Sequence, residues 1–197
     1  MAMFKNKNLK LEPYLHQIIP PILTCIISPS ITSDDHWSLR RQSSLLIFNL
    51  VEKYSNTYAT LVPRLSKTFY RYLVGDDLLG VYGSVFAIGA MGKQTCIEIL
   101  MPNARTITSK LYSNFKSDDI QVAINSKKCI DAFLLVLKPV LISVYWLEFY
   151  YRDFKKEDVF ELNGEQMDIV KQRLKDEFGL DFAAALIREF GFDDEMM

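Results

Sequence analysis

The feature that most constrains the fold is a proline-centred apolar segment that recurs along the chain at nearly regular intervals. In each copy an apolar run leads into a proline, and helix-forming sequence follows. The four copies are Ile18-Ile19-Pro20, Leu61-Val62-Pro63, Leu100-Met101-Pro102 and Leu137-Lys138-Pro139. Their prolines are separated by 43, 39 and 37 residues. Such a period indicates a chain built from stacked copies of one supersecondary unit.

This period is typical of HEAT and armadillo repeats, in which helices stack only on their neighbours. A proline inside a helix removes a backbone hydrogen bond and kinks the helix, so successive first helices would curve over one another. The alternative is four unrelated helices that begin with proline at the first position. The full apolar turn before each proline favours the kinked helices.

Acidic doublets mark the expected starts of the other helices. Asp34-Asp35, Asp76-Asp77 and Asp118-Asp119 each precede an apolar run, and aspartate both caps a helix start and suits its dipole. Two apolar stripes follow at helical spacing, made of Leu39, Leu46, Leu50 and Tyr54, and of Leu61, Leu65, Phe69 and Tyr72. The sequence therefore predicts an all-α, HEAT-type α-solenoid of three antiparallel helix pairs, with a fourth expected.

The charge changes sign along the chain, although the net charge is −1. Through Arg152 there are 17 basic and 11 acidic residues, and from Asp153 onward there are 6 and 13. We predict a solenoid over residues 9–152 and an acidic helical segment over residues 153–197 that caps the same domain. This segment has a stripe ended by Gly179 and a last helix capped by Asp181; the stripe is Met167, Val170, Leu174 and Phe178.

The sequence contains no recognisable catalytic motif, so neither an enzyme nor a cofactor is predicted. The glycine-rich stretch before Lys93 lacks the phosphate-loop pattern, because Ala87 replaces the first glycine and Gln94 separates Lys93 from Thr95. Small residues that let two helices approach closely explain it better. The histidines His16 and His36 have no metal-ligand spacing, and no metal is predicted.

The cysteines and the most hydrophobic segment both suggest a packed helical core. Cys25, Cys96 and Cys129 have no close pairs and sit in apolar stretches, so we expect three buried thiols. The segment Ala132–Leu147 is short for a membrane span and is interrupted by Lys138 and Pro139, so a buried helix is expected and no membrane partner.

The basic residues allow two interpretations. Arg64, Lys67 and Arg71 share one helix face, which is either solvated or binds a partner. The excess of basic residues before Asp153 is small for a nucleic-acid-binding domain, so direct contact with DNA is the alternative hypothesis and a protein-binding face the main one.

Several motifs in order resemble one known family. They are Leu11–Pro20 with Leu23-Thr24-Cys25, then His36–Arg40, Tyr54–Tyr58, Pro63-Arg64, Tyr82-Gly83 and Met101-Pro102-Asn103. Together they resemble the C-terminal HEAT domain of TATA-binding-protein-associated factor six, a TFIID subunit. The resemblance covers roughly residues 9–105. The histone fold of that family is absent from this sequence, so its pairing partner is not carried over.

The resemblance implies a non-enzymatic scaffold in the nucleus that contacts other TFIID subunits and supports assembly of the RNA polymerase II pre-initiation complex. No small-molecule substrate is implied, and weak contact with promoter DNA is the alternative. Trp and Arg often dominate protein interfaces. The predicted partner-binding residues are therefore those of these types and their neighbours: His36, Trp37, Arg40, Arg41, Tyr58, Arg64 and Arg71. The alternative places Trp37 in the core and pairs the arginines with Asp34 and Asp35.

Overall fold

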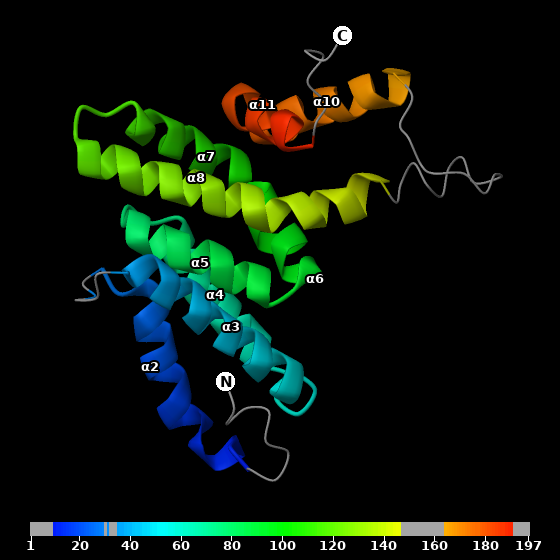
Figure 1. The fold of residues 1–197 in the computed structure, drawn as a ribbon. Coiled ribbons are helices and arrows are strands. Elements are labelled where there is room, and N and C mark those ends of the chain that lie inside the picture. The colour runs from blue at the N-terminus through cyan, green and yellow to red at the C-terminus, as the bar shows by residue number, and fades with distance from the viewer. Residues whose placement is uncertain (1–9, 30, 32–34, 147–163, 191–197) are drawn as a thin grey trace, which may run out of the picture. The chain divides into compact units, whose positions relative to one another are not determined.

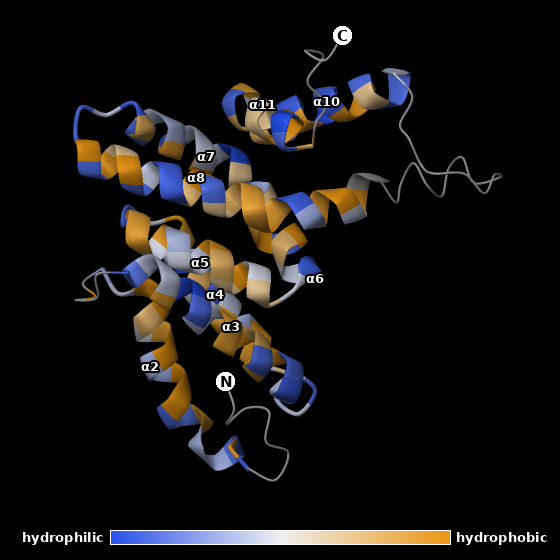
Figure 2. Cartoon of the chain, in the orientation of Figure 1, coloured by the Kyte–Doolittle hydropathy of each residue, from blue (hydrophilic) through white to orange (hydrophobic). Residues whose placement is uncertain are grey.

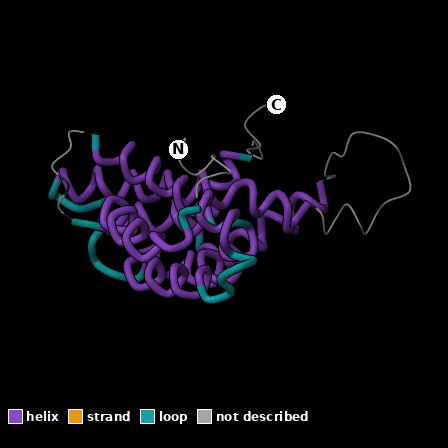
Figure 3. Tube along the Cα trace, turned by 90° about the horizontal axis from the view of Figure 1, so that it is seen from below, coloured by secondary structure: helices purple, strands orange, loops and turns teal. Residues whose placement is uncertain are grey.

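The structure is a computed structural model of the 197-residue chain. It describes residues 10–29, 31, 35–146 and 164–190, and every regular element in these ranges is a helix (Figures 1 and 3). The boundary expected between residues 152 and 153 lies outside the described residues. The chain divides into two compact units, residues 1–99 and residues 100–197, which are described separately below.

The first unit contains two helix pairs. Its elements are η1 (Glu12–Tyr14), α2 (Leu15–Ile27), α3 (His36–Tyr54), α4 (Leu61–Leu73), α5 (Leu78–Ala90) and the short α6 (Lys93–Thr95). Helix α2 packs on α3 and α5, and α4 packs mainly on α5. Two of the predicted caps are confirmed: Asp35 accepts a hydrogen bond from the Ser38 amide, and Asp77 accepts from the Leu79 and Gly80 amides.

The buried stripe of α3 differs from the predicted one. Leu50 and Tyr54 are buried as expected, but Leu39 and Leu46 are only half-buried, and Ile47 is fully buried. Leucine, isoleucine and phenylalanine fill the positions from 45 to 48, so spacing alone does not identify the inward residue. In α4 the predicted Leu61, Leu65 and Phe69 are confirmed, and Leu73 rather than Tyr72 completes the stripe.

Helix α5 is the central helix of this unit. It is apolar along most of its length, as Figure 2 shows, and is buried from Gly80 to Val85. A Cβ atom added to Gly83 would lie 2.0 Å from the carbonyl oxygen of Ile26 in α2. The expected close approach of two helices is therefore confirmed at Gly83.

The second unit contains four main helices. The π-helical turn η2 (Cys96–Leu100) contains the chain boundary between the units and is followed by α7 (Met101–Phe115), which packs on α8 (Ile120–Leu141). A second π turn, η3 (Ile142–Trp146), follows α8. Helices α10 (Gly164–Phe178) and α11 (Leu180–Glu189) pack on each other and on α7, and α11 also packs on α8.

The four repeated prolines occupy two kinds of position. Pro20 lies inside α2 and Pro139 inside α8, whereas Pro63 and Pro102 lie in the first turns of α4 and α7. The prediction that Pro139 belongs to a first helix is wrong, because α8 runs without a break from Ile120 to Leu141 and is the second helix of its pair. No glycine or turn-forming doublet lies between residues 130 and 139 to end it earlier.

The predicted helix starts and helix end of the second unit are confirmed in part. The Asp119 cap of α8 is confirmed by hydrogen bonds from the Gln121 and Val122 amides. Gly179 ends α10 as predicted, with a φ of 79°, but the predicted Asp181 cap of α11 is wrong, because Asp181 lies inside the first turn and makes no capping hydrogen bond.

Burial of the thiols follows the prediction in part. Cys96 and Cys129 are buried, and burial raises the pKa of the Cys96 thiol to about 11. Cys25 is only half-buried, so the expectation of three buried thiols is wrong at this position. Among the described residues, none of the helices has the length and hydrophobicity of a transmembrane segment. The part of Ala132–Leu147 that lies in α8 is a core segment with Phe133 and Leu137 buried.

Candidate partner-binding site

The seven predicted partner-binding residues all lie in the first unit, but the structure does not bring them to one place. His36, Trp37 and Arg41 join an aromatic cluster between α3 and α5. Tyr58 and Arg64 line a groove between α2 and α4. Arg40 belongs to neither feature and is buried against the end of α2.

Arg40 is a structural residue, which corrects its prediction as a partner-facing side chain. Its side chain is fully buried, and Nη1 donates to the carbonyl of Ile26 at 2.7 Å while Nη2 donates to the carbonyl of Ser28. Both carbonyls belong to the end of α2, where helix geometry leaves them without intrahelical partners. The guanidinium therefore terminates α2 and ties it to α3, and it also faces the negative end of the helix dipole.

The aromatic cluster is a continuous run of ring contacts. The ring centroids of His36 and Trp37 are 4.4 Å apart, those of Trp37 and Tyr82 4.6 Å, and those of Tyr82 and Phe86 4.9 Å. The guanidinium of Arg41 lies 5.6 Å from the Phe86 ring centroid, which is within cation–π range. Trp37 is half-buried, so it is both a packing residue and part of the surface.

The environment of His36 favours its neutral form by lowering the pKa of the imidazole. Burial lowers the pKa of its imidazole below the ordinary 6.5, and the charge of Arg40 lowers it further, while Asp35 opposes the shift. Its Nδ1 atom is buried without a hydrogen-bond partner in the described structure. A neutral ring is the form that such a desolvated position tolerates.

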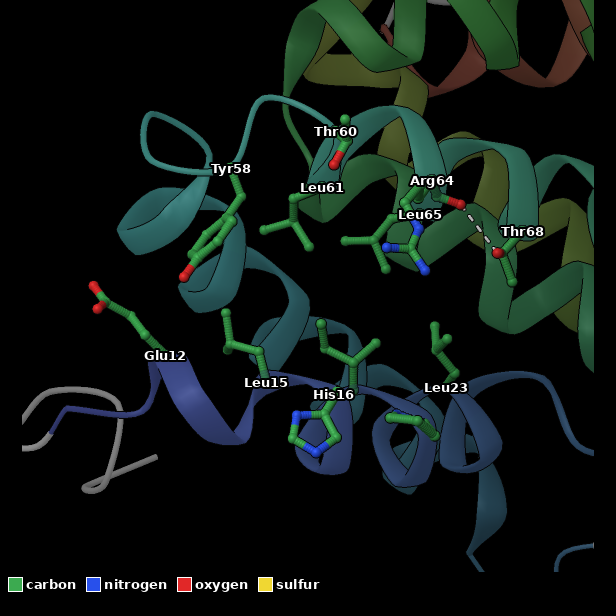
Figure 4. Close-up of a pocket in the computed structure, with 12 residues that line it drawn as sticks. Glu12, Leu15, His16, Leu23, Tyr58, Thr60, Leu61, Arg64, Leu65 and Thr68 are labelled. Atoms are coloured by element: carbon green, nitrogen blue, oxygen red, sulfur yellow. Dashed lines mark hydrogen bonds between the residues drawn. The ribbon is translucent and has the colours of Figure 1, made fainter.

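A groove lies between α2 and α4 in the first unit. Its volume is about 460 Å³. Figure 4 shows Leu15 and Leu23 of α2 facing Leu61 and Leu65 of α4 across the gap. Leu15, Ile19 and Leu23 recur every fourth residue along α2, and Leu61 and Leu65 do so along α4, so each helix contributes one apolar ridge.

Polar side chains surround this apolar floor. Glu12 and His16 stand on the α2 side, Tyr58 precedes α4, and Arg64 and Thr68 belong to α4. The Thr68 hydroxyl donates to the backbone carbonyl of Arg64 at 3.0 Å, and the Arg64 guanidinium points into the groove (Figure 4).

The last predicted residue, Arg71, is exposed on α4, two turns beyond Arg64, and does not line the groove. Sequence reasoning missed Tyr82 and Phe86 as parts of the aromatic cluster. It also missed the α2 side of the groove. The spacing of Leu15, Ile19 and Leu23 was the available signal, but an apolar stripe most often indicates core packing.

Two further observations concern metal binding and the second unit. No group of histidine, cysteine and carboxylate side chains within the described residues could hold a metal ion. The second unit has a shallower hollow at the start of α8, with exposed Ile120 and Ile124 beside Lys127 and Asp131.

Paired helices with capped starts and a partly open groove define an all-α helical repeat protein of the HEAT type. The chain belongs to the TAF6 C-terminal HEAT repeat domain family, whose model matches residues 1–105. The predicted fold class, an all-α HEAT-type α-solenoid of antiparallel helix pairs, and the predicted family are thereby confirmed.

Curated relatives carry names that agree with this family. The chain is 27% identical over 146 residues to the "SAGA complex/transcription factor TFIID complex subunit Taf6" of Schizosaccharomyces pombe, covering 70% of this chain and 32% of that protein. It is 29% identical over 122 residues to "Transcription initiation factor TFIID subunit 6" of Arabidopsis thaliana, covering 59% and 22%. The like-named protein of Drosophila melanogaster is 28% identical over 116 residues, covering 56% and 19%. The chain thus spans at most about a third of these relatives.

Proposed function

We propose that this chain is a non-enzymatic protein-interaction scaffold of a TFIID-type general transcription factor, which acts in the nucleus and supports assembly of the RNA polymerase II pre-initiation complex. The observation that carries the proposal is the family match over residues 1–105. The relatives named as TFIID or SAGA complex subunits support it, and other subunits of such a complex are the proposed partners.

The two surface features of the first unit support the same proposal, because both lie within the matched residues. The aromatic cluster presents Trp37 beside the exposed Arg41, and these are the residue types most often found at interface hot spots. The groove offers an apolar floor within a polar rim, which is the usual anatomy of an interface.

The test is copurification of the tagged full-length protein with transcription-complex subunits at moderate salt. A double variant, Arg41→Glu with Arg64→Glu, changes two exposed residues, and circular dichroism should show an unchanged fold. We expect reduced recovery of partner subunits. The matched control is Lys116→Glu with Lys175→Glu, which makes the same charge change at exposed positions of the second unit. Failure of the wild-type protein to recover any such subunit would refute the scaffold proposal.

Direct contact with promoter DNA is the second candidate. The exposed basic face formed by Arg64, Lys67 and Arg71 favours it. Binding to duplex DNA that weakens steeply with salt and is lost in Arg64→Glu with Lys67→Glu would support this candidate, since each phosphate contact releases counterions.

We also propose that the acidic C-terminal helices cap the second unit. Val170, Leu174 and Phe178 of α10 and Phe182 of α11 are buried, and both helices pack on α7. Arg105 donates to the carbonyl of Asp176, and Lys138 donates to the carbonyl of Glu189, which fastens the ends of α10 and α11 to α7 and α8. Their outward positions are mostly polar, as a terminal repeat requires.

A further inference from the structure

We infer that the groove between α2 and α4 is a receptor for a short, acidic, amphipathic helix of a partner protein. The inference rests on the proposed function only in that the partner is another protein. It begins from packing: α2 packs on α3 and α5 and α4 packs mainly on α5, so the two apolar ridges face each other across the groove. Leu15, Leu61 and Leu65 form its buried base, and the half-buried Ile19 and Leu23 are its accessible apolar side chains.

The floor of the groove fits a helix. Leu15, Ile19 and Leu23 span nine residues of α2, which is roughly 12 Å of helix axis. A guest helix of about two to three turns would cover this length and place apolar side chains between the ridges. Binding of an amphipathic helix in a groove between two helices is a recurrent mode of peptide recognition, with anchors at i, i+3, i+4 and i+7.

The basic charge of α4 beside the groove favours an acidic guest. Arg64 lines the groove, and Lys67 and Arg71, at i+3 and i+7 from it, extend the basic charge along α4 outside the lining, while neither α2 nor α4 contains an aspartate or glutamate. All three are exposed, and no described carboxylate forms an ion pair with any of them. Glu12, at the η1 end, is the one carboxylate that lines the groove.

The same observations disfavour two other occupants. Duplex DNA would use the basic face but would leave the accessible aliphatic side chains of the groove, Ile19 and Leu23, against a phosphate backbone, which makes no apolar contact with them. A second copy in a two-fold dimer would bring the basic face of α4 against itself, because an isologous interface pairs a surface with its own copy. An acidic helix satisfies both the floor and the rim.

The probe is a fluorescein-labelled synthetic peptide of about four turns, with leucines on one face and glutamates on the other. One control peptide replaces the glutamates with lysine, and a second replaces the leucines with serine. Fluorescence anisotropy with the full 197-residue chain measures binding. We expect the chain to bind the probe with micromolar affinity that weakens as salt is added. Each control peptide should bind at least about tenfold more weakly than the probe.

The protein variants locate the site. Arg64→Glu with Lys67→Glu should weaken probe binding about tenfold, and Leu23→Asn should weaken it without changing the salt dependence. The matched control, Lys116→Glu with Lys175→Glu, should stay within about twofold of the wild type. Circular dichroism of each variant verifies the fold, and the lysine peptide should regain affinity for the charge-reversed groove, which a misfolded variant would not show.

Four results would overturn the inference. The first is that the probe does not bind, and the second is that the glutamate and lysine peptides bind equally. The third is that duplex DNA displaces the probe at a lower concentration than the unlabelled peptide does. The fourth is that the chain self-associates and thereby displaces the probe. If the probe fails while the full-length protein still copurifies with transcription-complex subunits, the groove inference fails and the proposed function stands. If the probe binds but no such subunit copurifies, the proposed function fails and the groove inference stands.

Discussion

Arg40 and Gly83 approach the same atom, the carbonyl oxygen of Ile26. The guanidinium Nη1 lies 2.7 Å from that oxygen, and a Cβ on Gly83 would lie 2.0 Å from it. One arrangement therefore joins the end of α2 to α3 by a charged hydrogen bond and to α5 by backbone contact. Two predictions concern this junction.

Gly83→Ala should destabilise the first unit. The added methyl group would overlap the Ile26 carbonyl, and relief of that overlap requires α2 and α5 to separate, at a cost of about 1–3 kcal/mol that outweighs the better helix propensity of alanine. Urea unfolding followed by circular dichroism measures the loss. Gly164→Ala is the matched control, because nothing lies within 4 Å of its Cβ position, and it should not lower stability. Equal stability of the two variants would disprove the close approach.

Arg40→Met should reduce the free energy of unfolding by roughly 3 kcal/mol or more, since it leaves the carbonyls of Ile26 and Ser28 without this donor in a buried site. Arg41→Met, at the exposed neighbour, should lose less than about 1 kcal/mol, the range of an exposed cation–π contact. Thermal denaturation of both variants checks the contrast. An Arg40 variant as stable as the Arg41 variant would show that the buried guanidinium contributes little.

Ile47→Ala should cost about 2–5 kcal/mol, because the side chain is fully buried in α3 and its removal leaves a cavity. Leu46→Ala should cost clearly less, since Leu46 is half-buried. The two variants delete side chains of similar volume one residue apart, so their difference reports the inward direction of α3. Reversed costs, measured from denaturant midpoints, would restore the stripe predicted from the sequence.

Stability should fall as the pH decreases through 6.5, with His36 as one cause. The pKa of His36 is lowered in the folded chain, so between its folded value and the ordinary 6.5 the unfolded chain binds more protons. Protonation therefore favours unfolding in this window, and the stability is regained at higher pH. His36→Gln should show a smaller difference between urea midpoints at the two ends of the window. An unchanged pH dependence would mean that His36 titrates normally.

Removal of residues 164–197 should destabilise the second unit and promote aggregation. The deletion uncovers the surfaces of α7 and α8 on which α10 and α11 pack, including the neighbourhood of Phe133, whose ring centroid is 6.2 Å from that of Phe182. Light scattering and a thermal melt measure the effect. A monomeric truncated chain with an unchanged melt would show that the acidic helices are not a cap.

Much of the helical framework was predictable because it depends on local chemistry. Aspartates at helix starts, as at Asp77 and Asp119, act through hydrogen bonds to amides two or three residues away. Gly179 ends a helix through its own backbone freedom. Pro139 misled the prediction, because a proline that kinks a helix and one that starts a helix look alike in sequence.

The site was less predictable because it depends on contacts between distant segments. Arg40 and Arg41 are adjacent and chemically identical, yet one is buried beneath α2 and the other lies over Phe86. Only the end of α2, some twelve residues upstream, distinguishes them. The groove likewise depends on how α2 and α4 are held apart by their packing on other helices, which no local pattern encodes.

The packing of α10 on α7 has a consequence for the order of folding. The hydrogen bond from Arg105 to Asp176 closes a loop of 71 residues, whereas α7 and α8 are joined by a four-residue turn, Lys116 to Asp119. Closing the longer loop carries a larger entropy loss, although the loss grows only with the logarithm of loop length. Contacts between α7 and α8 should therefore form early and the docking of α10 and α11 late. In native-state hydrogen exchange, the amides of α10 and α11 should then exchange through partial opening at lower free energy than those of α8.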